Sequence, residues 1–570
     1  MRILLFGLNS SYTHTALALH SLGKSIRRFE PKIIEHTING RYGDFLSDIF
    51  RYRPDVLCFS CYIWNIEIIE ALLKDIKKVL PDVIILCGGP EVSYDCEDFL
   101  RRNPAVDYCI AGEGEEAFEA LMELFHGADT KIPSNVAYRQ GEKIFPNRTV
   151  GLIEDLDELD FPYDEVYIEN NKNKIFYYET SRGCPYSCSY CISSIDKTYR
   201  KKSLNKVIKE LEIFHRLGVP LVKLTDRTFN ADRKRALEIL NRIASLNTET
   251  SFHFEIAADL LDDDFIETLK RLPAGRVQIE AGIQTTNPKT LEAICRRISF
   301  ERSFGQLQKV IENGNVHVHT DLIAGLPYED INSFERSFDD VYRIGGHHLQ
   351  LGFLKLLKGT KIKDEYDRND SKYTEKAPYE ILKTPWLGYE DLLVLKDTEN
   401  AVERFHNSGH FTIVLEYIFR NEIFSPFQFF SSLGAYLKEN GYLSRPLSAY
   451  ECYEIFASFM KECQKVEEEH KEILSVLLQI DLISCFSYHK LPAALKKELD
   501  YSLKEKRQDN PFVKTYEPNR KALEIFNTKR RKLKSLSLFK RIADEDEVRL
   551  VRIDYSEKHP VTGRYLCEFL

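Results

Sequence analysis

The sequence has no apolar run that approaches the roughly 20 residues needed to cross a bilayer. Its first apolar run, Ile3 to Phe6, is also too short for the core of a secretory signal peptide and is typical of a buried strand. We therefore expect a cytoplasmic protein with no membrane partner. An excess of basic residues is lacking too, because the formal net charge is −9 over 570 residues. This balance argues against nucleic acid as a partner.

The remaining composition is that of a folded protein, with 43% hydrophobic and 29% charged residues. Residues 1–130 alternate short apolar runs, such as RILLFGL and VIILCGG, with amphipathic helical patterns. Five such units predict an α/β, doubly wound parallel sheet that binds its ligand beyond the carboxyl ends of the strands. Residues 131–169, with a hairpin pattern at NVAYRQGEKIF and the acidic stretch EDLDELDFPYDE, are interpreted as a linker.

Alternation of strand and helix patterns resumes over residues 170–390. Six units predict a partial (β/α)6 barrel with its active site again at the carboxyl ends of the strands. Residues 391–570 predict a mainly helical domain of unassigned role that ends in a hairpin at VRLVRIDYSEKHPVTGRYLCEF. The basic run from Lys529 to Arg541 is followed at once by acidic Asp544 to Glu547, which favours a solvated, self-paired helix face.

Three of the thirteen cysteines share one short loop, TSRGCPYSCSYC, just after the first predicted strand of the barrel. Cys184, Cys188 and Cys191 have C-x3-C-x2-C spacing, and Gly183 and Pro185 prevent a regular helix there. Three thiolates can ligate three irons of a 4Fe–4S cluster and leave the fourth iron open. A zinc site completed by a distant residue, or three unrelated buried thiols, are the alternatives.

This loop, at the end of the first strand of a β/α barrel, resembles the radical SAM superfamily, and Tyr190 matches the aromatic position of that family's motif. The resemblance implies that S-adenosylmethionine (SAM) binds the open iron and is cleaved to a 5′-deoxyadenosyl radical. It also implies an electron donor such as flavodoxin or ferredoxin. By position, Asp226 would bind the SAM amino group, Glu280, Gly282 and Gln284 would lie at the ribose, and Asp321 would back the adenine.

Loops after four strands of the N-terminal sheet carry a second set of candidate residues. The combination of GGPEVS and AGEGE upstream of a radical SAM barrel resembles the cobalamin-binding domain of the cobalamin-dependent radical SAM class. The glycines would let the backbone approach a large flat ligand closely. The candidate cobalamin-binding residues are Asn9, Ser10, His14, Ser60, Gly88, Gly89, Pro90, Glu91, Ser93, Glu113, Gly114 and Glu115.

His14 stands where cobalamin domains of the D-x-H-x-x-G type carry a histidine that ligates cobalt. Tyr12 and Leu17 replace the expected Asp and Gly, so the carboxylate that would orient the imidazole is missing. We therefore predict a base-off cobalamin without a strong ligand from the protein.

Together these features predict a cobalamin-dependent radical SAM enzyme that methylates an unactivated carbon or phosphorus centre of a small molecule or natural product. A radical rearrangement or cyclisation without methyl transfer is the alternative within the same class. A methylthiotransferase acting on RNA or protein would need further cysteines for a second cluster, and a non-catalytic cobalamin sensor would have no use for the cysteine triplet.

Overall fold

The structure is a computed structural model that describes residues 1–487, 490–491, 502–504, 513–517 and 551–569. The basic run from Lys529 to Arg541 lies outside the described residues, so its interpretation stays a prediction. None of the helices within the described ranges is both long and apolar enough to span a membrane.

The N-terminal sheet has the strand order β2-β1-β3-β4-β5-β6-β7, and β1 to β5 are mutually parallel. This confirms the predicted doubly wound sheet, whose order reverses at β1, where such sheets bind ligands. Helices α1 and α5 pack on one face, and α2, α3 and α4 on the other. The elements are β1 (Ile3–Asn9), α1 (Leu17–Ser25), β2 (Lys32–Thr37), α2 (Tyr42–Tyr52), β3 (Val56–Ser60), α3 (Ile66–Val79), β4 (Ile84–Gly88), α4 (Cys96–Arg102), β5 (Tyr108–Ile110) and α5 (Glu115–Phe125).

The hairpin that the sequence places inside the linker is present as β6 (Val136–Gln140) and β7 (Lys143–Phe145). It pairs antiparallel with β5, so the sheet extends into the segment interpreted as a linker. This pairing covers an edge strand that would otherwise expose its backbone hydrogen-bonding groups.

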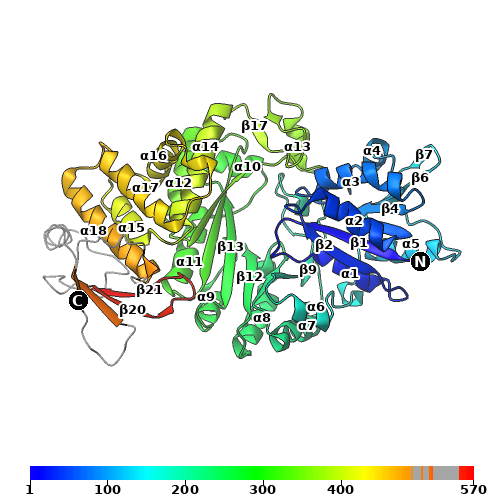
Figure 1. The fold of residues 1–570 in the computed structure, drawn as a ribbon, viewed down its shortest axis with the longest axis horizontal. Helices are drawn as coiled ribbons and strands as arrows, with labels where there is room; N and C mark the ends of the chain where they lie inside the picture. Colours follow the sequence, from blue (N-terminus) through cyan, green and yellow to red (C-terminus); the bar gives the residue numbers. More distant parts are fainter. Residues whose placement is uncertain (488–489, 492–501, 505–512, 518–550, 570) are drawn as a thin grey trace.

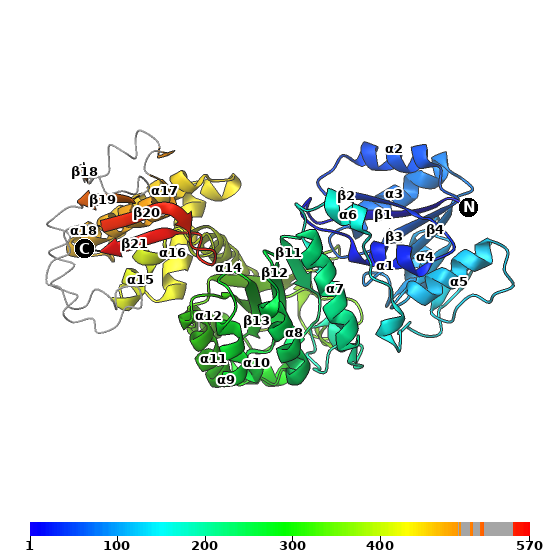
Figure 2. The same ribbon diagram turned by 90° about the horizontal axis from the view of Figure 1, so that it is seen from below.

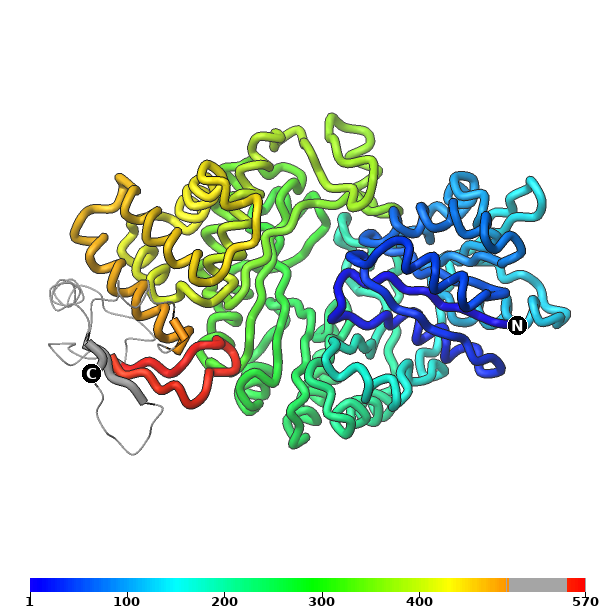
Figure 3. The backbone as a smooth tube through the Cα atoms, viewed as in Figure 1, coloured from blue at the N-terminus to red at the C-terminus, as the bar shows by residue number. Residues whose placement is uncertain are grey.

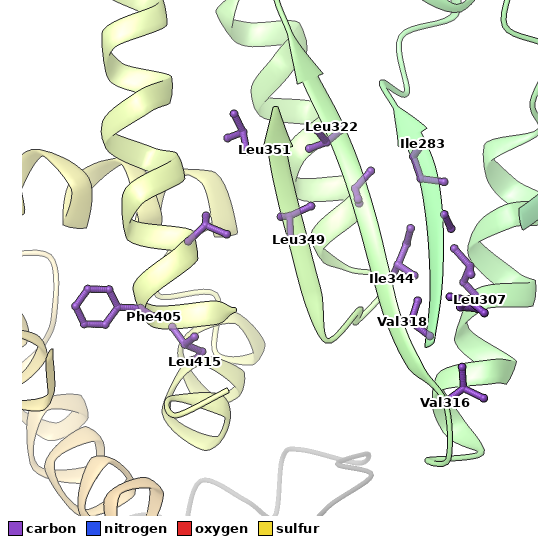
Figure 4. Packing of buried hydrophobic residues seen from close by; sticks show 14 of the residues in the cluster. Ile283, Leu307, Val316, Val318, Leu322, Ile344, Leu349, Leu351, Phe405 and Leu415 are labelled. Carbon is purple, nitrogen blue, oxygen red and sulfur yellow. The ribbon is translucent and has the colours of Figure 1, made fainter. Parts of the chain in front are cut away.

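The second sheet has six parallel strands in the order β15-β14-β13-β12-β11-β8, which confirms the partial barrel. Apolar side chains on one face of this sheet pack against the surrounding helices, as Figure 4 shows for Val318, Leu322 and Leu349. The elements are α6 (Glu165–Asn170), β8 (Phe176–Tyr178), β9 (Ser181–Arg182), β10 (Arg200–Lys201), α7 (Leu204–Leu217), β11 (Leu221–Leu224), α8 (Arg233–Ser245), β12 (Ser251–Ile256), α9 (Asp263–Lys270), β13 (Val277–Gln284), α10 (Pro288–Ala293), α11 (Phe300–Glu312), β14 (His317–Ala324), α12 (Ile331–Tyr342) and β15 (His348–Phe353).

The C-terminal part is mainly helical, as predicted, and shares one continuous apolar core with the barrel. Phe405 and Leu415 lie beside the barrel strands in Figure 4. The predicted final hairpin is confirmed and belongs to an antiparallel sheet with two further strands. The elements are α13 (Lys361–Tyr366), β16 (Lys372–Tyr373), β17 (Ile381–Lys383), α14 (Tyr389–Ala401), α15 (Thr412–Arg420), α16 (Pro426–Glu439), α17 (Ala449–Glu462), α18 (Glu468–Cys485), β18 (Ser502–Lys504), β19 (Val513–Glu517), β20 (Val551–Lys558) and β21 (Tyr565–Phe569).

The barrel lies in the middle of the molecule, with the N-terminal sheet on one side and helices α15 to α18 on the other (Figures 1 and 2). The tube drawing follows the same succession along the chain, from blue through green to orange (Figure 3). The carboxyl ends of the β1 and β8 strands therefore face a common region, and α1 packs close to β8.

Candidate active site between the two sheets

A cavity of about 700 Å³ lies between the N-terminal sheet and the barrel. Its walls are the loops after β1, β3, β4 and β5, together with Tyr177, Lys223, Thr225 and Glu255 from the ends of barrel strands. All the candidate cobalamin-binding residues line this cavity except Glu91. The volume is in the range of cavities that bind small molecules and cofactors.

Two of the predicted loops are held together by their own backbone. Gly89 has φ +105°, and a Cβ atom there would lie 2.7 Å from the carbonyl oxygen of Cys61. The hydroxyl of Ser93 donates to the Gly89 carbonyl at 2.8 Å and accepts from the Gly112 amide at 3.0 Å. Glycine is thus required at position 89 because the loop after β4 touches the loop after β3 there. From the sequence we had expected the glycine to let the backbone approach a ligand.

Glu113 and Glu115 reach across to the loop that carries the cysteines. Arg182, two residues before Cys184, lies 2.5 Å from Glu115 and 3.2 Å from Glu113. Arg200 lies 2.7 Å from Glu113. The side chain of Arg182 is only 13% exposed, so these are buried charges that hold each other in place. Both glutamates line the cavity and also dock the two domains.

Glu91 has a docking role away from the cavity wall. Its carboxylate accepts hydrogen bonds from Lys358, at 3.0 Å, and from the Tyr379 hydroxyl. Lys358 also lies 3.1 Å from Asp95. The structure therefore places the Glu91 side chain in an interdomain contact and outside the cavity lining, because it points to the segment between β15 and α14.

His14 makes its described side-chain contacts with the barrel. Its Nδ1 atom lies 2.6 Å from the Tyr177 hydroxyl, and the two rings stack with centroids 5.8 Å apart. Burial, reinforced by the charge of Lys223, lowers the pKa of His14, so the ring is neutral at pH 7. On the same cavity wall, Tyr62 and Trp64 stack at 4.3 Å, and the Trp64 side chain is partly open to the cavity.

The cysteine loop follows β9 directly. Cys184 and Cys188 are buried and Cys191 is half-buried. Gly183 has φ +82°, and a Cβ atom there would overlap the carbonyl oxygen of Thr198, so only glycine fits. Burial raises the pKa of Cys184.

Arg296 is the residue near these cysteines that the sequence did not predict. Its guanidinium lies 3.6 Å from the Cys188 sulfur, donates to the Tyr190 hydroxyl at 3.3 Å and also donates to the Gly282 carbonyl. It follows α10, 108 residues after Cys188, and its local sequence carries no motif. Its positive charge beside a thiolate position would stabilise an anionic centre there.

The predicted SAM-side residues fall into two groups. Asp226 is buried and accepts hydrogen bonds from the Thr180 amide, at 2.9 Å, the Thr180 hydroxyl, at 2.6 Å, and the Ser181 hydroxyl. Glu280 accepts from His253, at 3.0 Å, and Lys223, at 3.2 Å. Both oxygens of Asp226 are thus occupied by the protein itself, whereas both of these bonds to Glu280 end on its Oε2 atom.

In the second group, buried oxygens lack a partner within the described part of the chain. They are Oε1 of Gln284 and Oδ1 of Asp321. Burial, followed by the nearby charges of Glu280 and Glu255, raises the pKa of Asp321 to about 8. Gln284 has φ +75°, and a Cβ atom on Gly282 would lie 2.2 Å from the Gln284 amide nitrogen. Buried oxygens in this state take a hydrogen bond from a ligand or from water.

Comparisons with known proteins match this division of the chain. A family described as B12 binding domain matches residues 3–122, and the radical SAM superfamily matches residues 178–341. The chain is therefore a radical SAM enzyme with an N-terminal B12-binding domain. It belongs to the cobalamin-binding class of that superfamily. Residues 366–546 match a family described as a protein of unknown function (DUF4080).

Individual relatives are more distant. The uncharacterized methyltransferase PH0819 of Pyrococcus horikoshii is 26% identical over 329 residues, which are 56% of this chain and 71% of that protein. A 2-(S-pantetheinyl)-carbapenam-3-carboxylate methyltransferase of Streptantibioticus cattleyicolor is 30% identical over 312 residues, and the chain spans 46% of its length and 52% of its own. The structure of the cobalamin-dependent SAM radical enzyme OxsB aligns with this protein at a TM-score of 0.58, over 87% of this chain and 80% of the OxsB chain. The sequence identity is 13%, so the similarity is one of fold.

Family membership assigns a 4Fe–4S cluster, SAM and cobalamin as cofactors, and the residues present fit them. The cluster needs thiolates that each bind a separate iron. The cavity, with its exposed Trp64 face, suits a flat macrocycle, and the unpartnered Asp321 and Gln284 oxygens suit a polar nucleoside.

Proposed function

We propose that the protein transfers a methyl group from SAM to an unactivated carbon, or a phosphorus centre, of a small molecule. One observation carries this proposal: a single cavity is lined both by the loops that would bind cobalamin and by barrel residues beside the cysteine loop. A methyl donor and a radical source can act on one substrate only if both face the same space. The carbapenam methyltransferase named above supports a small-molecule substrate.

In this proposal Cys184, Cys188 and Cys191 hold the 4Fe–4S cluster, and Arg296 and Tyr190 lie beside it. When bound, the cofactors supply radical generation and methyl transfer, which are reactions that side chains alone do not perform. We propose that a flavodoxin or ferredoxin supplies the electron.

The other residues of the site orient the reacting groups. Asp226 fixes Thr180 and Ser181 at the start of the cysteine loop through its three hydrogen bonds. Burial alone would raise the pKa of Glu280, but the His253 hydrogen bond and the charge of Lys223 lower it to about 2. Glu280 therefore keeps its negative charge at pH 7, where it can accept a hydrogen bond from the ribose of SAM. Arg182 and Arg200 hold the N-terminal loops against the barrel through Glu113 and Glu115.

The test is an anaerobic incubation of the reconstituted enzyme with SAM that carries a deuterated methyl group, a reductant and a metabolite extract. We expect extract-dependent S-adenosylhomocysteine and 5′-deoxyadenosine, together with a product that contains the label. Triple substitution of Cys184, Cys188 and Cys191 to Ala should abolish all three, whereas Cys463→Ala, in the helical part at the end of α17, should retain them.

Products without the label, formed together with 5′-deoxyadenosine, would contradict methyl transfer and favour rearrangement or cyclisation. A triple variant that still binds about four irons per chain, as expected for one 4Fe–4S cluster, would contradict the cluster assignment.

A further inference from the structure

The concave face of the barrel sheet is polar. Along β14 the buried residues Val318, Thr320 and Leu322 alternate with half-buried His317, His319 and Asp321. Val318 and Leu322 belong to the apolar layer that packs against the helices (Figure 4), so the half-buried set faces the opposite side. Closed barrels of this type fill that side with bulky apolar side chains. Here the interior side of the sheet carries half-buried polar side chains instead.

Strand register brings four imidazoles together on this face. His319 is paired in register with Glu280 on β13 and with His348 on β15. Its ring centroid lies 4.7 Å from that of His317, 4.8 Å from that of His348 and 5.5 Å from that of His253. The sequence offered no signal for this group, because the four histidines come from three strands spread over 95 residues of chain, His253 to His348.

Several polar atoms of the imidazole group and its surroundings lack a full hydrogen-bond partner in the described part of the chain. Nδ1 of His317 is buried without a hydrogen-bond partner in the described part of the chain, as is Oδ1 of Asp321 on the same face. Asn407 donates to the Nε2 atom of His348 only at 3.5 Å, the limit of a hydrogen bond. The described contacts of the His319 ring are with other imidazoles. Polar atoms left in this state are costly unless a ligand completes them.

Burial lowers the pKa of three of the imidazoles, those of His317, His319 and His348, so that these rings are uncharged at neutral pH. Burial and then the neighbouring histidines lower the pKa of His317 to about 4 and that of His319 to about 3. A neutral imidazole presents one N–H donor and one acceptor nitrogen. The same four residues do not form a metal site, since none of the described residues are arranged to chelate one ion. The group is therefore suited to hydrogen bonds with a ligand's oxygen atoms.

We propose that the concave face around His317, His319 and His348 binds the substrate, and that the substrate is a water-soluble molecule with hydroxyl, carbonyl or carboxylate oxygens rather than a lipid. A hydrocarbon placed here would leave the imidazole nitrogens without partners, above all the buried Nδ1 atom of His317. This inference rests on the proposed function. The three histidines do not line the cavity themselves, but His319 pairs with Glu280, and Glu280 pairs with the cavity residue Glu255.

The test separates substrate class from methyl transfer by using two readouts. Holoenzyme, SAM with a deuterated methyl group and a reductant are incubated anaerobically with the aqueous or the chloroform-soluble fraction of an extract from the source cells. Stimulation of 5′-deoxyadenosine release reports substrate binding at the radical, whatever happens next. Label in the product reports methyl transfer.

We expect the aqueous fraction to stimulate 5′-deoxyadenosine release, and His319→Leu to lower that stimulation by about tenfold or more through the lost hydrogen bonds. His319→Gln, which keeps a donor and an acceptor, should retain more of it. Thr320→Ser, at the next position and on the helix-facing side, keeps the hydroxyl that donates to the His348 carbonyl at 3.5 Å; it is the matched control and should behave as the unmodified enzyme.

Stimulation by the chloroform fraction alone, by neither fraction, or equally in His319→Leu would overturn the inference. Stimulation by the aqueous fraction without label in the product would contradict methyl transfer and leave the substrate class standing.

Discussion

Replacement of Asp226 by Ala should release the cysteine loop. The sequence predicts Asp226 as a contact of the SAM amino group, but its carboxylate accepts three hydrogen bonds from Thr180 and Ser181, at the start of the cysteine loop. Each donor left unsatisfied in a buried position costs about 1–3 kcal/mol. Burial raises the pKa of Asp226, so removal of the buried carboxylate offsets part of this cost. A net loss of about 3 kcal/mol corresponds to an opening equilibrium shifted about a hundredfold.

The assay compares iron content and SAM affinity in the same preparation. We expect Asp226→Ala to bind substoichiometric iron after reconstitution, with a weaker charge-transfer band of the cluster. Asp339→Ala is the control, because that buried carboxylate on α12 accepts a hydrogen bond from the Phe427 amide of α16, at 2.7 Å, and so holds two helices together instead of the cysteine loop. Asp339→Ala should lower stability and keep its iron. Full iron content in Asp226→Ala with weakened SAM binding would refute this reasoning and restore the role that the sequence predicts.

Three further outcomes are expected. Arg182→Gln leaves Glu115 and Glu179 without their buried cation, at a cost of about 3–5 kcal/mol, and should speed hydrogen exchange in the loop after β5. Arg101→Gln breaks exposed ion pairs and should leave the exchange in that loop unchanged. Equal exchange rates in the two variants would contradict the docking role of Arg182. Cob(II)alamin bound to the protein should show an EPR spectrum without nitrogen superhyperfine splitting, and splitting that disappears in His14→Ala would show that the histidine is a ligand. Asp321 has a folded pKa of about 8 against an ordinary 3.8, so its contribution to stability is present below pH 4 and lost as the pH rises through 8. Asp321→Asn should therefore raise the melting temperature more at pH 8 than at pH 5, and an equal change at both values would contradict the raised pKa.

Local patterns in the sequence were enough for the two parallel sheets and for the loops of the site. Buried parallel strands are near-continuous apolar runs, such as Ile3 to Leu8, and are bounded by turn residues, so each strand can be recognised from its own residues. The C-x3-C-x2-C loop is equally local. The loops after the strands converge because the carboxyl ends of parallel strands share one edge of a sheet.

Contacts between distant segments could not be predicted in this way. Glu91 was assigned to cobalamin from its place in GGPEVS, but its partner Tyr379 is 288 residues away. Arg296 reaches Cys188 across 108 residues, and the imidazole group depends on the register of four adjacent strands, β12 to β15. Such pairs are set by the packing of whole domains, and neither partner carries a local signal of the other. The same holds for Asp226. The family resemblance predicts that its carboxylate contacts SAM, and the sequence carries no local signal that Thr180 and Ser181 donate hydrogen bonds to it.

The central claim is that cobalamin and the 4Fe–4S cluster face one cavity. The most direct test is the microwave power saturation of the cob(II)alamin EPR signal, measured with the cluster oxidised and with the cluster reduced to its paramagnetic state. A nearby paramagnet speeds spin relaxation, so we expect the signal to saturate at higher power when the cluster is reduced, and this change to be absent in the Cys184, Cys188 and Cys191 triple variant. Identical saturation in both cluster states would contradict a shared cavity.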